Sequence, residues 1–191
     1  MNPMRPKAFF PATTKCSVES FTLVEILVVI SIIGLLAGLA LPAIQGAQTA
    51  ARKGKAKAEM QSILTALKAY QNEYGRMPDS SALGTSVEGD GDSWFGGSAS
   101  QNLCWMLSGD NYGQQNPRQI VFLELPPTST NGVFLDPWKR QYNIKLDTSG
   151  NNIMDYYQKN YNGTALIISL GKNGLQDDPA SSASDDVYSF K

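Results

Sequence analysis

The sequence predicts an α+β fold in which one long N-terminal helix packs on a small antiparallel sheet. Two observations lead to this prediction. Residues 21–74 favour helix throughout, first as a continuous apolar run and then with apolar residues at helical spacing. Beyond residue 76, short runs of alternating apolar and polar residues lie between turns rich in Gly, Asn and Pro, which is typical of antiparallel strands.

Residues 21–41 predict a transmembrane helix. They contain one ionisable residue, Glu25, and are otherwise apolar or small. At about 1.5 Å per residue they span roughly 31 Å, the thickness of the hydrocarbon core of a bilayer. Basic residues in segment 1–20 favour a cytoplasmic N-terminus. Five more basic residues lie at positions 52–68, on the other side of the helix, so the positive-inside rule alone does not decide the orientation. Position alone also leaves Glu25 open: its carboxylate either reaches the membrane interface or has a dedicated cationic partner.

Residues 42–75 predict an amphipathic helical stem that continues the first helix. One face of this stem is apolar, and it presents Met60, Ile63, Leu64, Leu67, Tyr70 and Tyr74. Pro42 removes a backbone hydrogen bond, so we expect a bend or local melting there. Gly75 and Pro78 should end the helix.

Residues 76–191 predict a globular head. Segment 76–116 is rich in Gly, Ser, Asp and Asn, and it predicts an irregular loop with at most one short helix near 103–107. Segment 118–125 is apolar and could be helix or strand. Segments 141–147 and 164–171 predict strands, the first from its alternation and the second as a short buried run.

The composition argues against catalysis and against nucleic-acid binding. The chain has no His, and 17 acidic residues nearly balance 16 basic ones. We find no nucleophile motif, phosphate loop or paired-carboxylate arrangement, so we do not expect an enzyme. The two cysteines, Cys16 and Cys104, lie in such different segments that an intrachain disulfide is not expected.

The N-terminal string Ser20-Phe21-Thr22-Leu23-Val24-Glu25, followed by an unbroken apolar helix ending near Pro42, resembles type IV pilins and type II secretion pseudopilins. The resemblance implies that residues 1–20 are a leader, which a prepilin peptidase removes before methylating the new Phe21 amine. It also implies that Glu25 pairs with that amine in a neighbouring subunit of a filament. Ser20 stands where the family usually has Gly.

Two C-terminal stretches resemble the major pseudopilin of type II secretion, a subfamily with a pilin-like fold. Residues 134–144 resemble its Asp-Pro-Trp segment, with Lys139 in place of the usual Gly, and residues 169–190 resemble its C-terminal loop. In those relatives the loop binds one calcium ion. The resemblance implies that Asp185 and Asp186 are the best side-chain ligands here, with Asp177 and the Leu170 carbonyl as weaker candidates. Irregular loops do offer the oxygen ligands that calcium requires.

The resemblance implies a structural subunit of a periplasmic pseudopilus, anchored in the inner membrane with its head in the periplasm. Its partners would be copies of itself, other pseudopilins, the prepilin peptidase, the inner-membrane secretion platform and lipid. A type IV pilin of a surface fibre is the first alternative, although such pilins commonly carry a disulfide. The second is a monomeric, signal-anchored envelope protein whose head binds a ligand.

Overall fold

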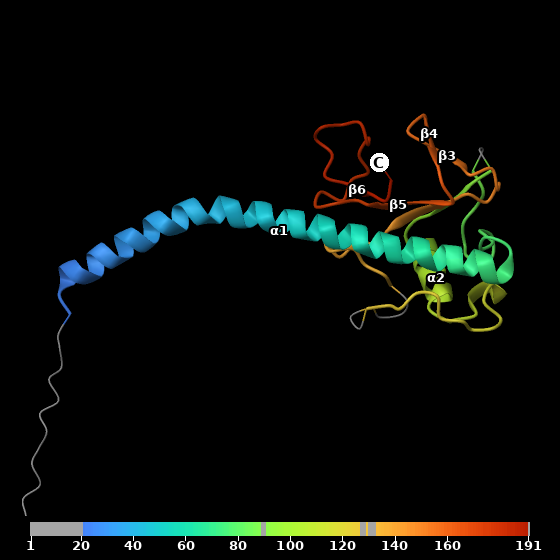
Figure 1. The fold of residues 1–191 in the computed structure, drawn as a ribbon, viewed down its shortest axis with the longest axis horizontal. Helices are drawn as coiled ribbons and strands as arrows, with labels where there is room; N and C mark the ends of the chain where they lie inside the picture. Colours follow the sequence, from blue (N-terminus) through green and yellow to red (C-terminus); the bar gives the residue numbers. More distant parts are fainter. Residues whose placement is uncertain (1–20, 89–90, 127–128, 130–132, 191) are drawn as a thin grey trace, which may run out of the picture. The chain divides into compact units, whose positions relative to one another are not determined.

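A computed structural model describes residues 21–88, 91–126, 129 and 133–190, without the side chain of Pro42. Its elements follow the chain in Figure 1. They are α1 (Leu23–Tyr74), β1 (Ser93–Phe95), α2 (Ser98–Leu107), a 3-10 turn η1 (Tyr112–Gln114), β2 (Asn143–Leu146), β3 (Ile153–Tyr156), β4 (Lys159–Asn162), β5 (Ala165–Ser169) and β6 (Val187–Tyr188). The chain divides into two compact units, one ending at Gln45 and the other running from Gly46 to Lys191.

The described part of the first unit is the N-terminal portion of α1. Its apolar side chains, from Phe21 to Ile44, are exposed. The helix is long and apolar enough to cross a membrane, judged by its length and composition alone. The backbone is helical at Pro42, so the expected local melting does not occur.

In the second unit, α1 buries the predicted apolar stripe. Met60, Ile63, Leu67 and Tyr70 are fully buried, whereas Leu64 and Tyr74 are partly buried against the same core. The helix ends at Gly75, whose positive φ of 68° and 2.8 Å hydrogen bond to the Gln71 carbonyl form a glycine C-cap. The apolar face predicted for this part of the helix is therefore buried.

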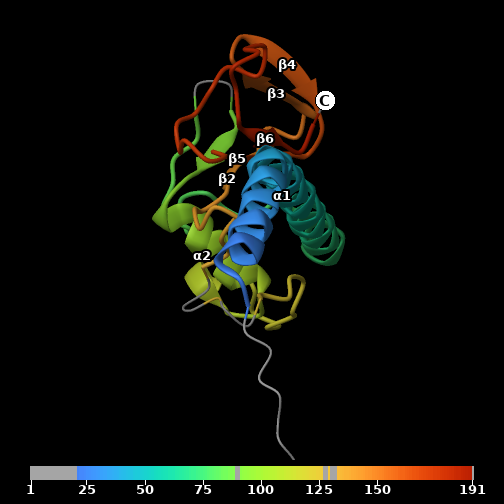
Figure 2. The same ribbon diagram turned by 90° about the vertical axis from the view of Figure 1, so that its left-hand side faces the viewer.

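The head contains a four-stranded antiparallel sheet with the order β1-β2-β5-β6, and β3 and β4 form a separate hairpin. The central pair is in register at Ile144 and Ile167. In both views, the hairpin and α2 lie on opposite sides of the head (Figures 1 and 2). The α+β layout predicted from the sequence is thus observed.

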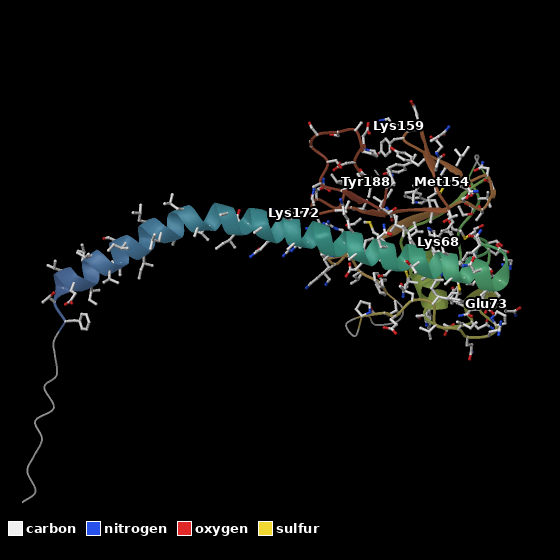
Figure 3. All side chains as sticks on the ribbon, viewed as in Figure 1. Lys68, Glu73, Met154, Lys159, Lys172 and Tyr188 are labelled. Carbon is white, nitrogen blue, oxygen red and sulfur yellow. The ribbon has the colours of Figure 1, made fainter. Side chains whose placement is uncertain are left out.

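The sheet is buried on both faces because two apolar clusters form, one on each side. Ile144, Leu146 and Ile167 join the stem stripe and α2 in the larger cluster. Leu166 and Ile168, which alternate with them, join a second cluster beneath the hairpin. Met154 and Tyr188 of this second cluster are labelled in Figure 3. The polar face predicted for segment 141–147 is therefore covered, and Lys145 is buried.

Three segments of the head have a secondary structure that the sequence did not predict in full. The predicted loop 76–116 contains strand β1 as well as the expected helix, which starts earlier, at Ser98. Segment 118–125 forms neither helix nor strand, but Leu123 is buried and Phe122 packs edge-on against Tyr70. The last strand, β6, has only two residues, too few to give a periodic pattern.

Candidate metal centre

The acidic loop, residues 170–186, leaves the end of β5 and returns to β6. It begins with a tight turn at Gly171, which has a φ of 55°. A Cβ added there would lie 2.5 Å from the Asp185 carbonyl oxygen. Only glycine fits this position without displacement, since the returning backbone passes so close. The turn brings the two ends of the acidic loop together.

Three of the predicted ligands meet at that closure. One carboxylate oxygen from each of Asp177, Asp185 and Asp186 lies within 4.8 Å of the others. Asp186 is buried, and the other two are half-buried. Three carboxylates at such spacing repel one another unless a proton or a cation neutralises them.

Each carboxylate is held by hydrogen bonds to one of its oxygens. Asp185 Oδ2 accepts bonds from the Lys172 and Asn173 amides, at 2.8 and 3.0 Å. Asp186 Oδ2 accepts a bond from the Asp177 amide at 2.9 Å. The Oδ1 atoms of Asp185 and Asp186 are buried and have no hydrogen-bond partner among the described residues. The loop therefore orients these two carboxylates and leaves one oxygen of each without a partner.

Such orphaned oxygens are costly unless a ligand satisfies them. Burial raises the pKa of Asp186, while the Asp177 amide and the Tyr188 hydroxyl act to lower it. A bound cation would remove the desolvation penalty by pairing with the charge. Since all donors are oxygens, the residues fit a hard divalent cation rather than a transition metal.

The fourth predicted ligand, the Leu170 carbonyl, is a main-chain oxygen that takes part in a hydrogen bond of the loop itself. The Leu170 carbonyl accepts a 3.0 Å hydrogen bond from the Gly174 amide, which leaves its second lone pair free to bind an ion. Asp178, although acidic and adjacent, lies outside the triad and accepts a bond from the Ala180 amide at 2.8 Å.

A second polar cluster, formed around Asp136, contacts the start of the acidic loop. The Asp136 carboxylate is buried, and its Oδ1 accepts bonds from the Trp138 and Arg140 amides at 2.9 and 2.8 Å. The Arg140 guanidinium in turn donates to the Gly171 carbonyl. The Asp-Pro-Trp segment thus forms a tight turn that contacts the first residues of the acidic loop.

The N-terminal site residues are separate from this centre. Ser20 lies outside the described residues. Phe21 is exposed just before α1, and Glu25 lies in the first turn of that helix. The Thr22 hydroxyl accepts a 3.3 Å bond from the Glu25 amide, as a helix N-cap does. No ion pair of Glu25 is formed within the part of the chain that the structure describes.

Sequence reasoning missed the residues that hold the carboxylates in place. The Lys172 and Asn173 amides carry no side-chain signature, and the Tyr188 hydroxyl reaches Asp186 at 3.2 Å from a strand too short to predict. Arg140 is distant in sequence, and only the fold brings it to the acidic loop. The glycines at 171 and 174 were the one available signal of a tight turn.

No family model, curated protein or solved structure matches this chain. The family resemblance therefore rests on the residues at 20–42, 134–144 and 169–190.

Proposed function

We propose that this chain is a structural subunit of a periplasmic pseudopilus that drives type II protein secretion. In this proposal a prepilin peptidase cleaves before Phe21 and methylates the new amine. The processed chain then assembles through α1 with copies of itself and with other pseudopilins, on an inner-membrane secretion platform. The observation that carries the proposal is an exposed apolar helix with one acidic residue, Glu25, in its first turn.

The position of Glu25 supports this role because a carboxylate in an apolar helix needs a partner. A free Phe21 amine on a neighbouring subunit would supply a cation at nearly the same depth. The helix N-terminus also favours a negative charge, so Glu25 is compatible with both the membrane-stored and the assembled state.

The cysteine content favours a pseudopilin over a pilin of a surface fibre. Removal of a leader containing Cys16 would leave Cys104 as the one cysteine, and Cys104 is a free, buried thiol in α2. The mature chain could not form the intrachain disulfide that is common in major pilins. The alternative of a monomeric anchored binding protein predicts an uncut N-terminus and no contact between neighbouring helices.

The same proposal assigns calcium to the acidic triad. Calcium prefers six to eight oxygens in flexible geometry, and the acidic loop offers carboxylates beside main-chain carbonyls. Asp185 and Asp186 would be the main ligands because each has an orphaned buried oxygen. Asp177 and the Leu170 carbonyl would be the remaining ligands that the protein supplies.

The test of the function is mass spectrometry of the chain produced with a prepilin peptidase. We expect a mature N-terminus at Phe21 bearing one methyl group. Glu25→Gln should be processed normally but should fail to form filaments or cross-links between neighbouring α1 helices. A chain that retains residues 1–20, or a Glu25→Gln variant that assembles like the parent, would contradict the proposal.

A further inference from the structure

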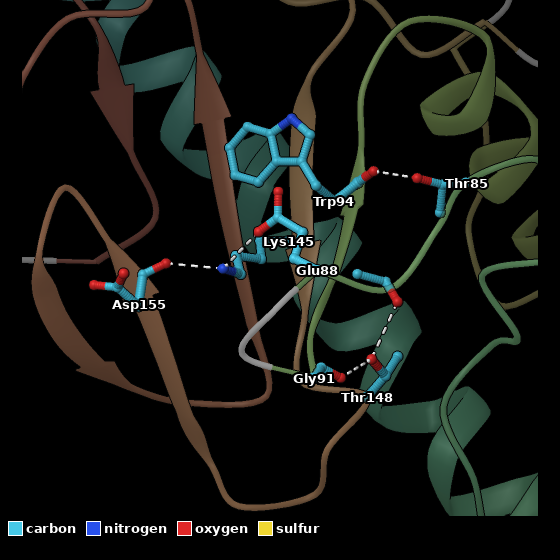
Figure 4. Close-up of polar contacts among 8 residues, drawn as sticks. Thr85, Glu88, Gly91, Trp94, Lys145, Thr148 and Asp155 are labelled. Atoms are coloured by element: carbon cyan, nitrogen blue, oxygen red, sulfur yellow. Dashed lines mark hydrogen bonds and ion pairs between the residues drawn. The ribbon is translucent and has the colours of Figure 1, made fainter.

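A second site lies on the face of the sheet that the β3–β4 hairpin covers. It is a pocket of about 800 Å³, within the range of about 300–1,000 Å³ that is usual for small-molecule sites. It opens between the β1–β2 edge and the hairpin turn, and part of its wall is drawn in Figure 4. Its lining residues are Glu88, Trp94, Lys145, Asp155, Tyr156 and Tyr157, with Gln176 from the acidic loop.

Strand register brings the wall together. Trp94 on β1 is the direct cross-strand partner of Lys145 on β2, so both side chains project from the same face. The hairpin carries Tyr156 over that face, where its ring is parallel to Trp94 within 9°, at a centroid distance of 6.0 Å. Tyr157 follows at the turn and is 42% exposed. The pocket thus has an aromatic surface of three rings.

The charged groups of the pocket largely compensate one another. The Lys145 side chain is 4% exposed, and its Nζ lies 3.0 Å from Glu88 Oε2 and 2.9 Å from the Asp155 carbonyl (Figure 4). Glu88 remains about half exposed. Lys145 is therefore paired within the wall, and its charge balances that of Glu88. The exposed part of the Glu88 carboxylate can accept hydrogen bonds from a ligand.

One polar atom in the wall has no partner. The Tyr156 hydroxyl is buried and makes no hydrogen bond to the described residues. The Gln176 side chain approaches it and acts to lower its pKa, but the geometry falls short of a hydrogen bond. Burial has the larger effect and raises this pKa, so the hydroxyl keeps its proton. A buried hydroxyl that keeps its proton is available to a ligand.

We propose that this pocket binds a neutral saccharide of one or two pyranose rings. The apolar face of a sugar ring packs on aromatic side chains, here Trp94 and Tyr157. Sugar hydroxyls would donate to the Glu88 carboxylate and accept from the Tyr156 hydroxyl and the Gln176 side-chain amide. The ion pair of Lys145 with Glu88 leaves little net charge in the wall to hold either an organic cation or an anion. A neutral, hydroxyl-rich ligand suits all of these groups.

The test is saturation-transfer difference NMR and titration calorimetry on the full chain, in a detergent whose head group is not a sugar. The probes are maltose, cellobiose and N,N′-diacetylchitobiose, with tetramethylammonium as the cation. We expect saturable binding of at least one disaccharide, with a Kd of about 1 mM or tighter. Trp94→Ala and Tyr156→Phe should each weaken it by roughly tenfold, from lost ring packing and a lost hydroxyl donor.

The matched control is Trp105→Ala, because Trp105 is 37% exposed on α2 and does not line the pocket. It should bind sugars like the parent chain. Tyr156→Phe removes only a hydroxyl that has no hydrogen-bond partner among the described residues, so it tests the site without disturbing the core, and thermal melts verify the fold of each variant. The proposal fails if no disaccharide saturates below about 10 mM, if tetramethylammonium binds in its place, or if Trp94→Ala leaves the affinity unchanged.

A second arm identifies the source of the sugar. Sedimentation with purified cell-wall glycan, compared between the parent chain and Trp94→Ala, shows whether a polymer occupies the pocket. Trp94-dependent sedimentation assigns the site to a wall glycan. Saturable binding of disaccharides without it assigns the site to free sugars.

Discussion

Ser169 donates a 2.6 Å hydrogen bond from its hydroxyl to Asp136 Oδ2, and both residues are buried. This bond joins the Asp-Pro-Trp turn to the last residue of β5, where the acidic loop begins. The two stretches that resemble pseudopilins are thus parts of one structure, because the turn anchors the start of the acidic loop.

Removing the Asp136 carboxylate should therefore destabilise the head strongly. Asp136→Ala leaves the Trp138 and Arg140 amides and the Ser169 hydroxyl without their acceptor. We expect the free energy of unfolding in urea to fall by about 3 kcal/mol. Ser169→Ala removes only one of these bonds and should cost about 1 kcal/mol. Equal losses in the two variants would contradict the central role of Asp136.

Calcium should stabilise the chain through the acidic triad. At a calcium concentration 100 times the Kd, ligand binding adds about 2.7 kcal/mol to the free energy of unfolding, or roughly 5–10 °C in Tm. Thermal melts with calcium and with EGTA measure this shift. Asp185→Ala and Asp186→Asn should abolish it, because each removes a carboxylate with an orphaned oxygen.

The control for that experiment is Asp178→Asn, in the same acidic loop but outside the triad. It should keep the calcium-dependent shift. If EGTA leaves the Tm of the parent chain unchanged, or if Asp178→Asn loses as much as Asp185→Ala, the assignment of calcium to the triad is wrong.

Cys104 should be inert in the folded chain. Its side chain is buried in the larger apolar cluster, and burial raises the pKa of the thiol to about 12. Because the thiolate is the reactive form, iodoacetamide at pH 8 should not label Cys104 until the chain is denatured. The measurement requires a Cys16→Ser background when the uncut precursor is used. Rapid labelling under native conditions would show that α2 opens readily.

Lys139 stands at a position that favours glycine. Its φ is 66°, in the left-handed region, and its side chain is exposed. Lys139→Gly should raise the free energy of unfolding by about 0.5–1 kcal/mol, since a Cβ is disfavoured there. Lys139→Ala keeps the Cβ and should bring no such gain. A loss of stability in Lys139→Gly would indicate that the lysine side chain contributes contacts of its own.

Long periodic segments were predictable because their burial pattern is local. The stem stripe from Met60 to Tyr70 follows helical spacing, and β2 and β5 are short apolar or alternating runs. Composition alone favours a solvated acidic tail for residues 177–186, and the three carboxylates were singled out because residues 169–190 resemble the C-terminal loop of the major pseudopilin. These features depend on residues close together in the sequence.

Most of the features that could not be predicted depend on contacts between residues that are far apart in the sequence. Strands β1 and β6, with three and two residues, are too short for any period and exist through pairing with β2 and β5. Segment 118–125 looked regular, but Gln119 has a φ of 51° and the Asn116 side chain bonds the Ile120 amide and carbonyl. Lys145 alternates with apolar residues along its segment, a pattern typical of an exposed position, but the hairpin covers it and the side chain is buried.

The shortness of β6 has a consequence for the stability of the chain against aggregation. Val187 and Tyr188 pair with the outer side of β5, directly after the acidic loop. A strand of two residues is held only weakly by its own pairing with β5. It therefore depends on the acidic loop that precedes it to stay in place. Opening that loop would expose an apolar strand edge, rich in isoleucine, to pairing with other chains. The acidic loop would therefore protect this strand edge from pairing with other chains, and a cation that stabilises the loop would strengthen that protection.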